Sequence, residues 1–180
     1  YYASPAGETY VVFGGDFTGA ATHAGTVTAD TLVGDATANV IVAGQGDDTL
    51  DGGDGYDRIS ESADVDFTAT DSSLTGLGSD TLINIQLVQL FGGASDNTIN
   101  TSAFSGRAFL NGSGGHDTLT GGGWYDRLFG GSGRDLITGG TSVMDSGTGL
   151  PTYDVLRGQG GNNDTLIGGD GNDKLNGGAG

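Results

Sequence analysis

Single aliphatic residues recur along this chain every nine positions, each two residues after an aspartate or asparagine. The interval is unbroken over residues 25–69, where the eighth positions of successive nonapeptides are Leu32, Ile41, Leu50, Ile59 and Thr68. We interpret positions 1–6 of each nonapeptide as a loop and positions 7–9 as a short strand. The eighth residue then points inward, and its equivalents in neighbouring coils stack into a thin core.

Glycine follows the same nine-residue interval. The template carries glycine at positions 1, 2 and 4 and aspartate at position 6, and it is clearest in 130–138 (GGSGRDLIT), 168–176 (GGDGNDKLN), 52–60 (GGDGYDRIS) and, less perfectly, 43–51 (AGQGDDTLD). Glycine tolerates positive φ, so such a loop can turn tightly while its carbonyl groups stay uncovered and close together. The repeat therefore predicts a solenoid with aspartate-bearing loops along its edges.

The regular interval breaks over residues 70–91. This segment holds one recognisable unit, TGLGSDTLI, with Asp80 in sixth position, and then the apolar run 82–91 (LINIQLVQLF). Alternation places Ile83, Ile85, Leu87 and Phe91 on one face. We expect one or two longer strands packed against a thicker part of the core, with an amphipathic helix as the alternative.

The sequence divides into four parts on this basis. Residues 1–24 hold a predicted strand, 9–13, and a linker over 18–24, and 25–69 form a first repeat array. Residues 70–91 connect it to a second array, 92–180, which carries an insertion at 141–150 and an eleven-residue unit with Ala108 in place of the aspartate. The chain ends within a further repeat, and we expect it to be part of a longer protein.

Charge and composition narrow the classes of function. The formal net charge is −17, which disfavours binding to nucleic acid or anionic lipid and favours cations as partners. Cysteine is absent, so disulfides and thiolate metal sites are excluded, and bound metal is one of the few remaining ways to stabilise a thin core. We find no apolar run of membrane-spanning length, no HExxH motif and no catalytic constellation, so an enzyme is not expected within these residues.

The repeats resemble the RTX (haemolysin-type or serralysin-type) calcium-binding nonapeptides, GGxGxDxUx. This resemblance implies an all-β fold, a right-handed parallel β-roll with two nonapeptides in each coil, and Ca²⁺ held between a loop and the loop one coil further on. The residues YVVFGG at 10–15 weakly resemble the end of an FG-GAP repeat, although a strand capping the solenoid is the simpler interpretation.

Calcium prefers six to eight hard oxygen ligands, which two stacked loops can supply and one cannot. By the family pattern, one Ca²⁺ is bound by the carbonyls at positions 2 and 4 of the earlier loop, by the carbonyls at positions 1 and 3 of the later loop, and by the sixth-position side chains of both loops. The resemblance implies the pairs Asp117–Asp135, Asp135–Asp164, Asp126–Asp154, Asp154–Asp173, Asp30–Asp48 and Asn39–Asp57, and less securely Asp48–Asp66. The candidate ligands are Asp30, Asn39, Asp48, Asp57, Asp66, Asn97, Ser113, Gly115, Asp117, Gly122, Asp126, Gly130, Gly131, Ser132, Gly133, Asp135, Asp154, Gly158, Gly160, Asp164, Gly168 and Asp173.

Two roles are compatible with these features. The first is a calcium-dependent structural module of a large secreted bacterial protein, such as an adhesin exported by type I secretion, with possible cell-surface or polysaccharide contacts. The second is an accessory domain of a secreted protease, lipase or mannuronan epimerase whose catalytic part lies elsewhere. His23 and His116 are too far apart to indicate zinc, and Trp124 and Tyr125 place aromatic surface beside a loop.

Overall fold

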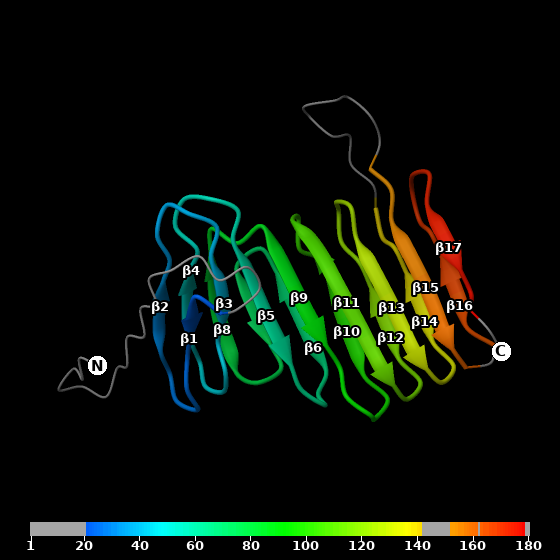
Figure 1. Ribbon diagram of the computed structural model, residues 1–180, viewed down its shortest axis with the longest axis horizontal. Coiled ribbons are helices and arrows are strands. Elements are labelled where there is room, and N and C mark those ends of the chain that lie inside the picture. The colour runs from blue at the N-terminus through cyan, green and yellow to red at the C-terminus, as the bar shows by residue number, and fades with distance from the viewer. Residues whose placement is uncertain (1–20, 142–151, 162, 179–180) are drawn as a thin grey trace.

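The computed structural model describes residues 21–141, 152–161 and 163–178, and this part of the chain forms an elongated solenoid (Figure 1). The strands lie across the long axis of the molecule and follow one another from the N-terminal to the C-terminal end. All regular structure in the described residues is β-strand, so no helix there could cross a membrane. The helix considered for 82–91 is therefore wrong.

The strands form two sheets, and consecutive strands alternate between them except at one junction. The first sheet contains, in spatial order, β1 (His23–Ala24), β3 (Val40–Val42), β5 (Arg58–Ser62), β9 (Leu87–Phe91), β11 (Arg107–Gly114), β13 (Arg127–Ser132), β15 (Val155–Gly160) and β17 (Lys174–Asn176). The second contains β16 (Thr165–Ile167), β14 (Leu136–Thr138), β12 (Thr118–Thr120), β10 (Thr98–Ala103), β6 (Phe67–Thr70), β7 (Ser73–Thr75), β8 (Ser79–Ile83), β4 (Thr49–Asp51) and β2 (Thr31–Val33).

Outside the junction around β7, neighbouring strands are parallel, and in the regular arrays they pair two nonapeptides apart. Leu32 lies opposite Leu50 and Leu119 opposite Ile137, so equivalent positions of successive coils coincide. This register confirms the all-β parallel roll, with one nonapeptide of each coil in each sheet.

The eighth positions form the core, as predicted. Those that are at most 1% exposed are Leu32, Ile41, Leu50, Ile59, Ile99, Leu110, Leu119, Leu128, Ile137 and Leu156. At the C-terminal edge, Leu175 is 48% exposed because no further described coil covers it. Each coil therefore shares its apolar surface with its neighbours, and the solenoid depends on stacking.

One junction departs from the regular coil. After β6 the chain turns back through β7, which is antiparallel to both β6 and β8, so the second sheet runs β4–β8–β7–β6–β10. In consequence β8 pairs with β4, while β6 is displaced by two strands and pairs with β10. The first sheet has only β9 between β5 and β11, so the two sheets differ in width here.

The junction overturns two detailed predictions. In β6 the buried residues are Phe67 and Ala69, and Thr68 faces outward, because a one-residue shift of register moves every side chain to the opposite face. The apolar run 82–91 forms two strands with a bend at Asn84 (φ 53°), and its core face is Leu82, Val88 and Leu90 rather than the face that carries Ile83.

The N-terminal predictions are only partly covered by the described residues. Residues 23–24 of the expected linker form strand β1, which pairs with β3. The strand expected at 9–13, with its FG-GAP resemblance, and residues 142–150 of the insertion lie outside the described residues.

Candidate metal centres

The sixth-position side chains are linked in rows along both edges of the solenoid. On one edge the backbone N–H of Asp117 donates to Oδ1 of Asp135 at 2.9 Å, and that of Asp135 donates to Oδ1 of Asp164 at 3.0 Å. The same hydrogen bond, always from the earlier coil to the later one, joins Asp30 to Asp48, Asn39 to Asp57, Asn97 to Asp117, Asp126 to Asp154, and Asp154 to Asp173. The structure therefore brings together every predicted pair except Asp48–Asp66.

The second oxygen of these carboxylates is left without a partner. Oδ2 is buried and makes no hydrogen bond in Asp48, Asp57, Asp117, Asp135 and Asp154. A buried carboxylate oxygen without a donor is costly, and a bound cation is one of the few things that compensates it. The orphaned oxygens thus have the chemistry that Ca²⁺ requires.

Backbone carbonyl groups surround these oxygens. Around Gly112, an ideal Cβ would lie 2.1 Å from Oδ2 of Asp117 and 2.6 Å from the carbonyl oxygen of Gly130, so the two oxygens are neighbours. The carbonyl oxygens of Ser113 and Gly115 lie close to Gly131 and Gly133 of the next coil. A Cβ added to these two glycines would lie 2.2 and 1.7 Å from the respective oxygens. Close approach of this kind is why those two later positions must be glycine.

The same arrangement recurs for the other predicted carbonyl ligands. The carbonyl oxygen of Gly168 and Oδ2 of Asp154 both lie beside Gly139, and the carbonyl of Gly122 lies against Gly140. Gly158 lies beside Oδ2 of Asp164. The position-3 carbonyls of Ser132 and Gly160 already accept backbone N–H groups of the preceding coil, from Gly115 and Gly133. They retain one lone pair each for a cation.

The loops fall into two conformations, which we name open and closed. In a closed loop the N–H at position 2 donates to the loop's own sixth side chain, as in Thr26–Asp30 (2.7 Å), Asp35–Asn39 (2.9 Å), Gly93–Asn97 (2.7 Å) and Gly122–Asp126 (2.7 Å). In an open loop position 2 has positive φ, which leaves Oδ2 unpaired, as at Gly44, Gly53, Ser113, Gly131 and Gly140. Ser113 adopts this conformation (φ 77°) although a non-glycine residue is strained there.

Burial raises the pKa of several of these carboxyl groups. It raises the pKa of Asp117 and Asp154 to about 6 and that of Asp126 to about 7, with neighbouring aspartates adding to the shift. The pKa of Asp135 is raised for the same reason, against the lowering effect of the Asp117 N–H. Without a cation, the fold favours the protonated form of these side chains.

The assignment of Asp66 as a partner of Asp48 is wrong. Because β6 is displaced towards β10, Asp66 is exposed and accepts the backbone N–H of Thr98. Asp80 takes its place, accepting the N–H of Asp48 at 3.0 Å, and burial raises its pKa to about 6.

Two further polar side chains at the junction were not predicted. In the coil that follows Asp57, Gln86 stands at the sixth position of the repeat, and its Oε1 accepts the backbone N–H of Asp57 at 2.6 Å. Glu61 is buried, accepts the N–H groups of Ala43 and Gly44, and has its pKa raised to about 7 by burial. Its position between two coils was not visible in the sequence, because Glu61 belongs to a decayed repeat unit.

The described residues contain no group of three or more His, Asp or Glu side chains arranged as a metal site. Such clusters are not expected where two carboxylates and several carbonyls share an ion. His23 is buried, and burial lowers its pKa, while His116 is exposed and accepts the N–H of Arg134.

Comparison with protein families identifies the repeats. The RTX calcium-binding nonapeptide repeat matches in four copies, at residues 25–59, 102–123, 111–142 and 154–180, which together span more than half of the chain. The chain therefore belongs to the RTX calcium-binding repeat family, and Ca²⁺ is its cofactor. No curated protein matches it significantly.

Proposed function

We propose that this calcium-binding module folds when a secreted parent protein meets extracellular Ca²⁺, and that it serves there as a structural or adhesin segment. The observation that carries the proposal is the set of five buried Oδ2 atoms without partners, on Asp48, Asp57, Asp117, Asp135 and Asp154. Export through a type I secretion system and a Gram-negative origin are consistent with RTX repeats, which are typical of such proteins.

The open loops are the proposed calcium sites. Each would bind the ion with Oδ2 of its own aspartate, its carbonyls at positions 2 and 4, and the position-1 carbonyl and sixth side chain of the next coil. For the Asp117 loop these are Ser113, Gly115, Gly130 and Asp135. The closed loops at Asp30, Asn39, Asn97 and Asp126 already satisfy the equivalent oxygen with a backbone N–H, so we assign them weak sites or none.

Charge repulsion makes this folding depend on the cation. Two carboxylates about 5 Å apart repel by roughly 3 kcal/mol at an effective dielectric constant near 20. Several such pairs lie in rows on a chain with a net charge of −17. At tenfold excess over its Kd, each bound ion adds about 1.4 kcal/mol, so five ions add about 7 kcal/mol, comparable with the stability of a typical domain. Binding and folding should therefore occur together.

Circular dichroism of the isolated chain tests this proposal. We expect a disordered spectrum in EDTA, a β-rich spectrum in millimolar Ca²⁺, and little response to equimolar Mg²⁺, which accepts this carbonyl-rich geometry poorly. An identical spectrum in EDTA and in Ca²⁺ would refute calcium-dependent folding.

A further inference from the structure

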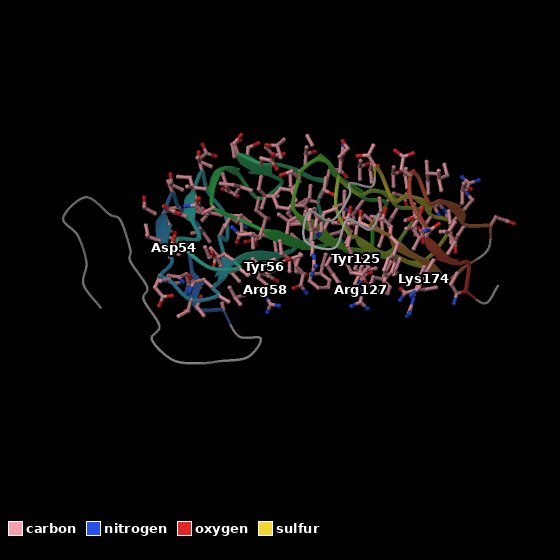
Figure 2. All side chains as sticks on the ribbon, turned by 90° about the horizontal axis from the view of Figure 1, so that it is seen from above. Asp54, Tyr56, Arg58, Tyr125, Arg127 and Lys174 are labelled. Carbon is pink, nitrogen blue, oxygen red and sulfur yellow. The ribbon has the colours of Figure 1, made fainter. Side chains whose placement is uncertain are left out.

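The basic residues of this acidic chain are concentrated on one face. Of the six Lys and Arg residues, five lie at outward-facing positions on the strands of the first sheet: Arg58, Arg107, Arg127, Arg157 and Lys174. Figure 2 shows Arg58, Arg127 and Lys174 along the same long side of the molecule. The outward positions of these strands carry no aspartate or glutamate, so positive charge is locally uncompensated within the face.

Aromatic rings alternate with these cations. The Arg107 guanidinium lies 5.8 Å from the ring centre of Tyr56 and 5.6 Å from that of Tyr125. Tyr125 packs edge-on against Tyr153 at 5.0 Å, and Nζ of Lys174 lies 4.6 Å from the ring of Tyr153. In space, the side chains therefore form one continuous row across the coils, in the order Tyr56, Arg107, Tyr125, Tyr153 and Lys174.

A second row lies beside the first. Phe91, Phe109 and Phe129 follow one another with ring centres 5.8 and 5.2 Å apart. Arg127 lies 5.9 Å from the rings of Phe109 and Phe129, and Arg157 lies 5.7 Å from that of Phe129. These rings hold the guanidinium groups over the sheet in fixed positions, since cation–π contact orients them.

The first row borders a cavity of about 330 Å³. Its walls include the rings of Tyr56 and Trp124, the guanidinium of Arg107, and the polar side chains of Gln86 and Ser105. Aromatic walls suit the apolar faces of a pyranose ring, a guanidinium binds a carboxylate with two hydrogen bonds, and the Ser105 hydroxyl can serve a sugar hydroxyl. The cavity therefore combines the groups that a single acidic sugar unit requires.

We propose that this face binds an acidic polysaccharide, with one uronate unit in the Tyr56–Arg107–Trp124 cavity and the following units along the cation–aromatic rows. The second row follows three neighbouring strands, β9, β11 and β13, which lie about 4.8 Å apart, comparable with the length of one pyranose unit. The net charge of −17 repels any polyanion at long range, so binding would depend on the local cations of this face. The inference goes beyond calcium binding, but it needs the folded state and so relies on Ca²⁺ being present.

The single tryptophan of the chain, Trp124, gives a direct readout. The probe is a short oligogalacturonate, titrated in Ca²⁺ while circular dichroism confirms the fold and tryptophan fluorescence reports binding. We expect saturable binding that weakens with salt and that is lost with the methyl-esterified oligomer, which keeps the rings but lacks the charges. A failure of calcium-dependent folding would be seen in the dichroism, separately from a failure to bind sugar.

Substitutions localise the effect. Arg107→Ala should weaken binding at least tenfold and Arg127→Ala less, while Arg134→Ala, which removes the one cation outside this face, should leave binding unchanged. Equal binding of the methyl ester, equal loss in Arg107→Ala and Arg134→Ala, or tighter binding of a single-stranded oligonucleotide would overturn the proposal. So would self-association of the chain that Arg107→Ala abolishes, because the face would then be a contact between copies.

Discussion

Replacing Asp135 by asparagine tests the stacked sites most specifically. Asp135 is 1% exposed and links two neighbours, since its Oδ1 accepts the N–H of Asp117, its own N–H donates to Oδ1 of Asp164, and its Oδ2 is unpaired. Asparagine keeps an oxygen for the Asp117 N–H but removes the charge from both sites. At tenfold excess of Ca²⁺ the loss of two ions should cost about 3 kcal/mol.

That loss can be measured in a calcium titration followed by circular dichroism. If about five ions are coupled to folding, 3 kcal/mol raises the Ca²⁺ concentration at the folding midpoint roughly threefold. Calorimetry of the folded variant should show about two fewer bound ions than the parent chain.

Asp126→Asn is the matched control. Asp126 is also buried, but both of its oxygens accept backbone N–H groups, from Ala108 and Gly122, in a closed loop. Asparagine leaves one of these donors unpaired and should destabilise the fold by about 1–3 kcal/mol without changing the number of bound ions. If Asp126→Asn loses as many ions as Asp135→Asn, or if Asp135→Asn loses none, the division into open and closed loops is incorrect.

Three other predictions follow from the same geometry. Gly133→Ala should prevent coil stacking and raise the Ca²⁺ concentration at the folding midpoint more than tenfold, since its φ is 131° and a Cβ would lie 1.7 Å from the Gly115 carbonyl oxygen. The control Gly123→Ala meets only Thr141 Oγ1 at 3.9 Å and should be neutral. Similar midpoints for the two variants would refute this. Gln159→Gly should stabilise the calcium-bound fold by up to about 1 kcal/mol, because Gln159 has φ 72°; a lower Tm would contradict it. In EDTA the β-sheet signal should be stronger at pH 5 than at pH 7.5, because burial raises the pKa of Asp117 and Asp154 to about 6 and of Glu61 to about 7. The native state then binds more protons than the unfolded state, and stability falls as pH rises through these values; a signal that grows with pH in EDTA would exclude this origin.

The repeat interval was sufficient to predict a solenoid and its core, and the resemblance to RTX repeats added the parallel roll and the pairing of loops one coil apart. These features depend only on local turn chemistry and on a fixed spacing, so each nonapeptide specifies its own part of the structure. The eighth position and the sixth position hold from Leu32 to Leu156 wherever the interval is regular.

The junction could not be predicted in the same way. The unit containing Asp80 was visible, but that β8 rather than β6 would pair with β4 depends on the hairpin through β7, a long-range choice that no local pattern records. Asp66 was therefore assigned to a site that Asp80 completes.

The distinction between open and closed loops has a signal in the sequence at position 4. The closed loops carry Thr28, Thr37, Ser95 or Trp124 at position 4, whereas the described open loops carry glycine with positive φ there, at Gly46, Gly55, Gly115 and Gly133. The cation–aromatic face has no such signal, because its side chains come from separate strands and meet only through the coil register.

Calorimetric titration of the chain with Ca²⁺, read for stoichiometry and compared with circular dichroism on the same samples, tests the central claim most directly. We predict about five bound ions, one for each unpaired carboxylate on Asp48, Asp57, Asp117, Asp135 and Asp154, with the β-sheet signal rising over the same range of Ca²⁺. Binding of one ion at every sixth position, or a β-sheet signal already complete in EDTA, would contradict it.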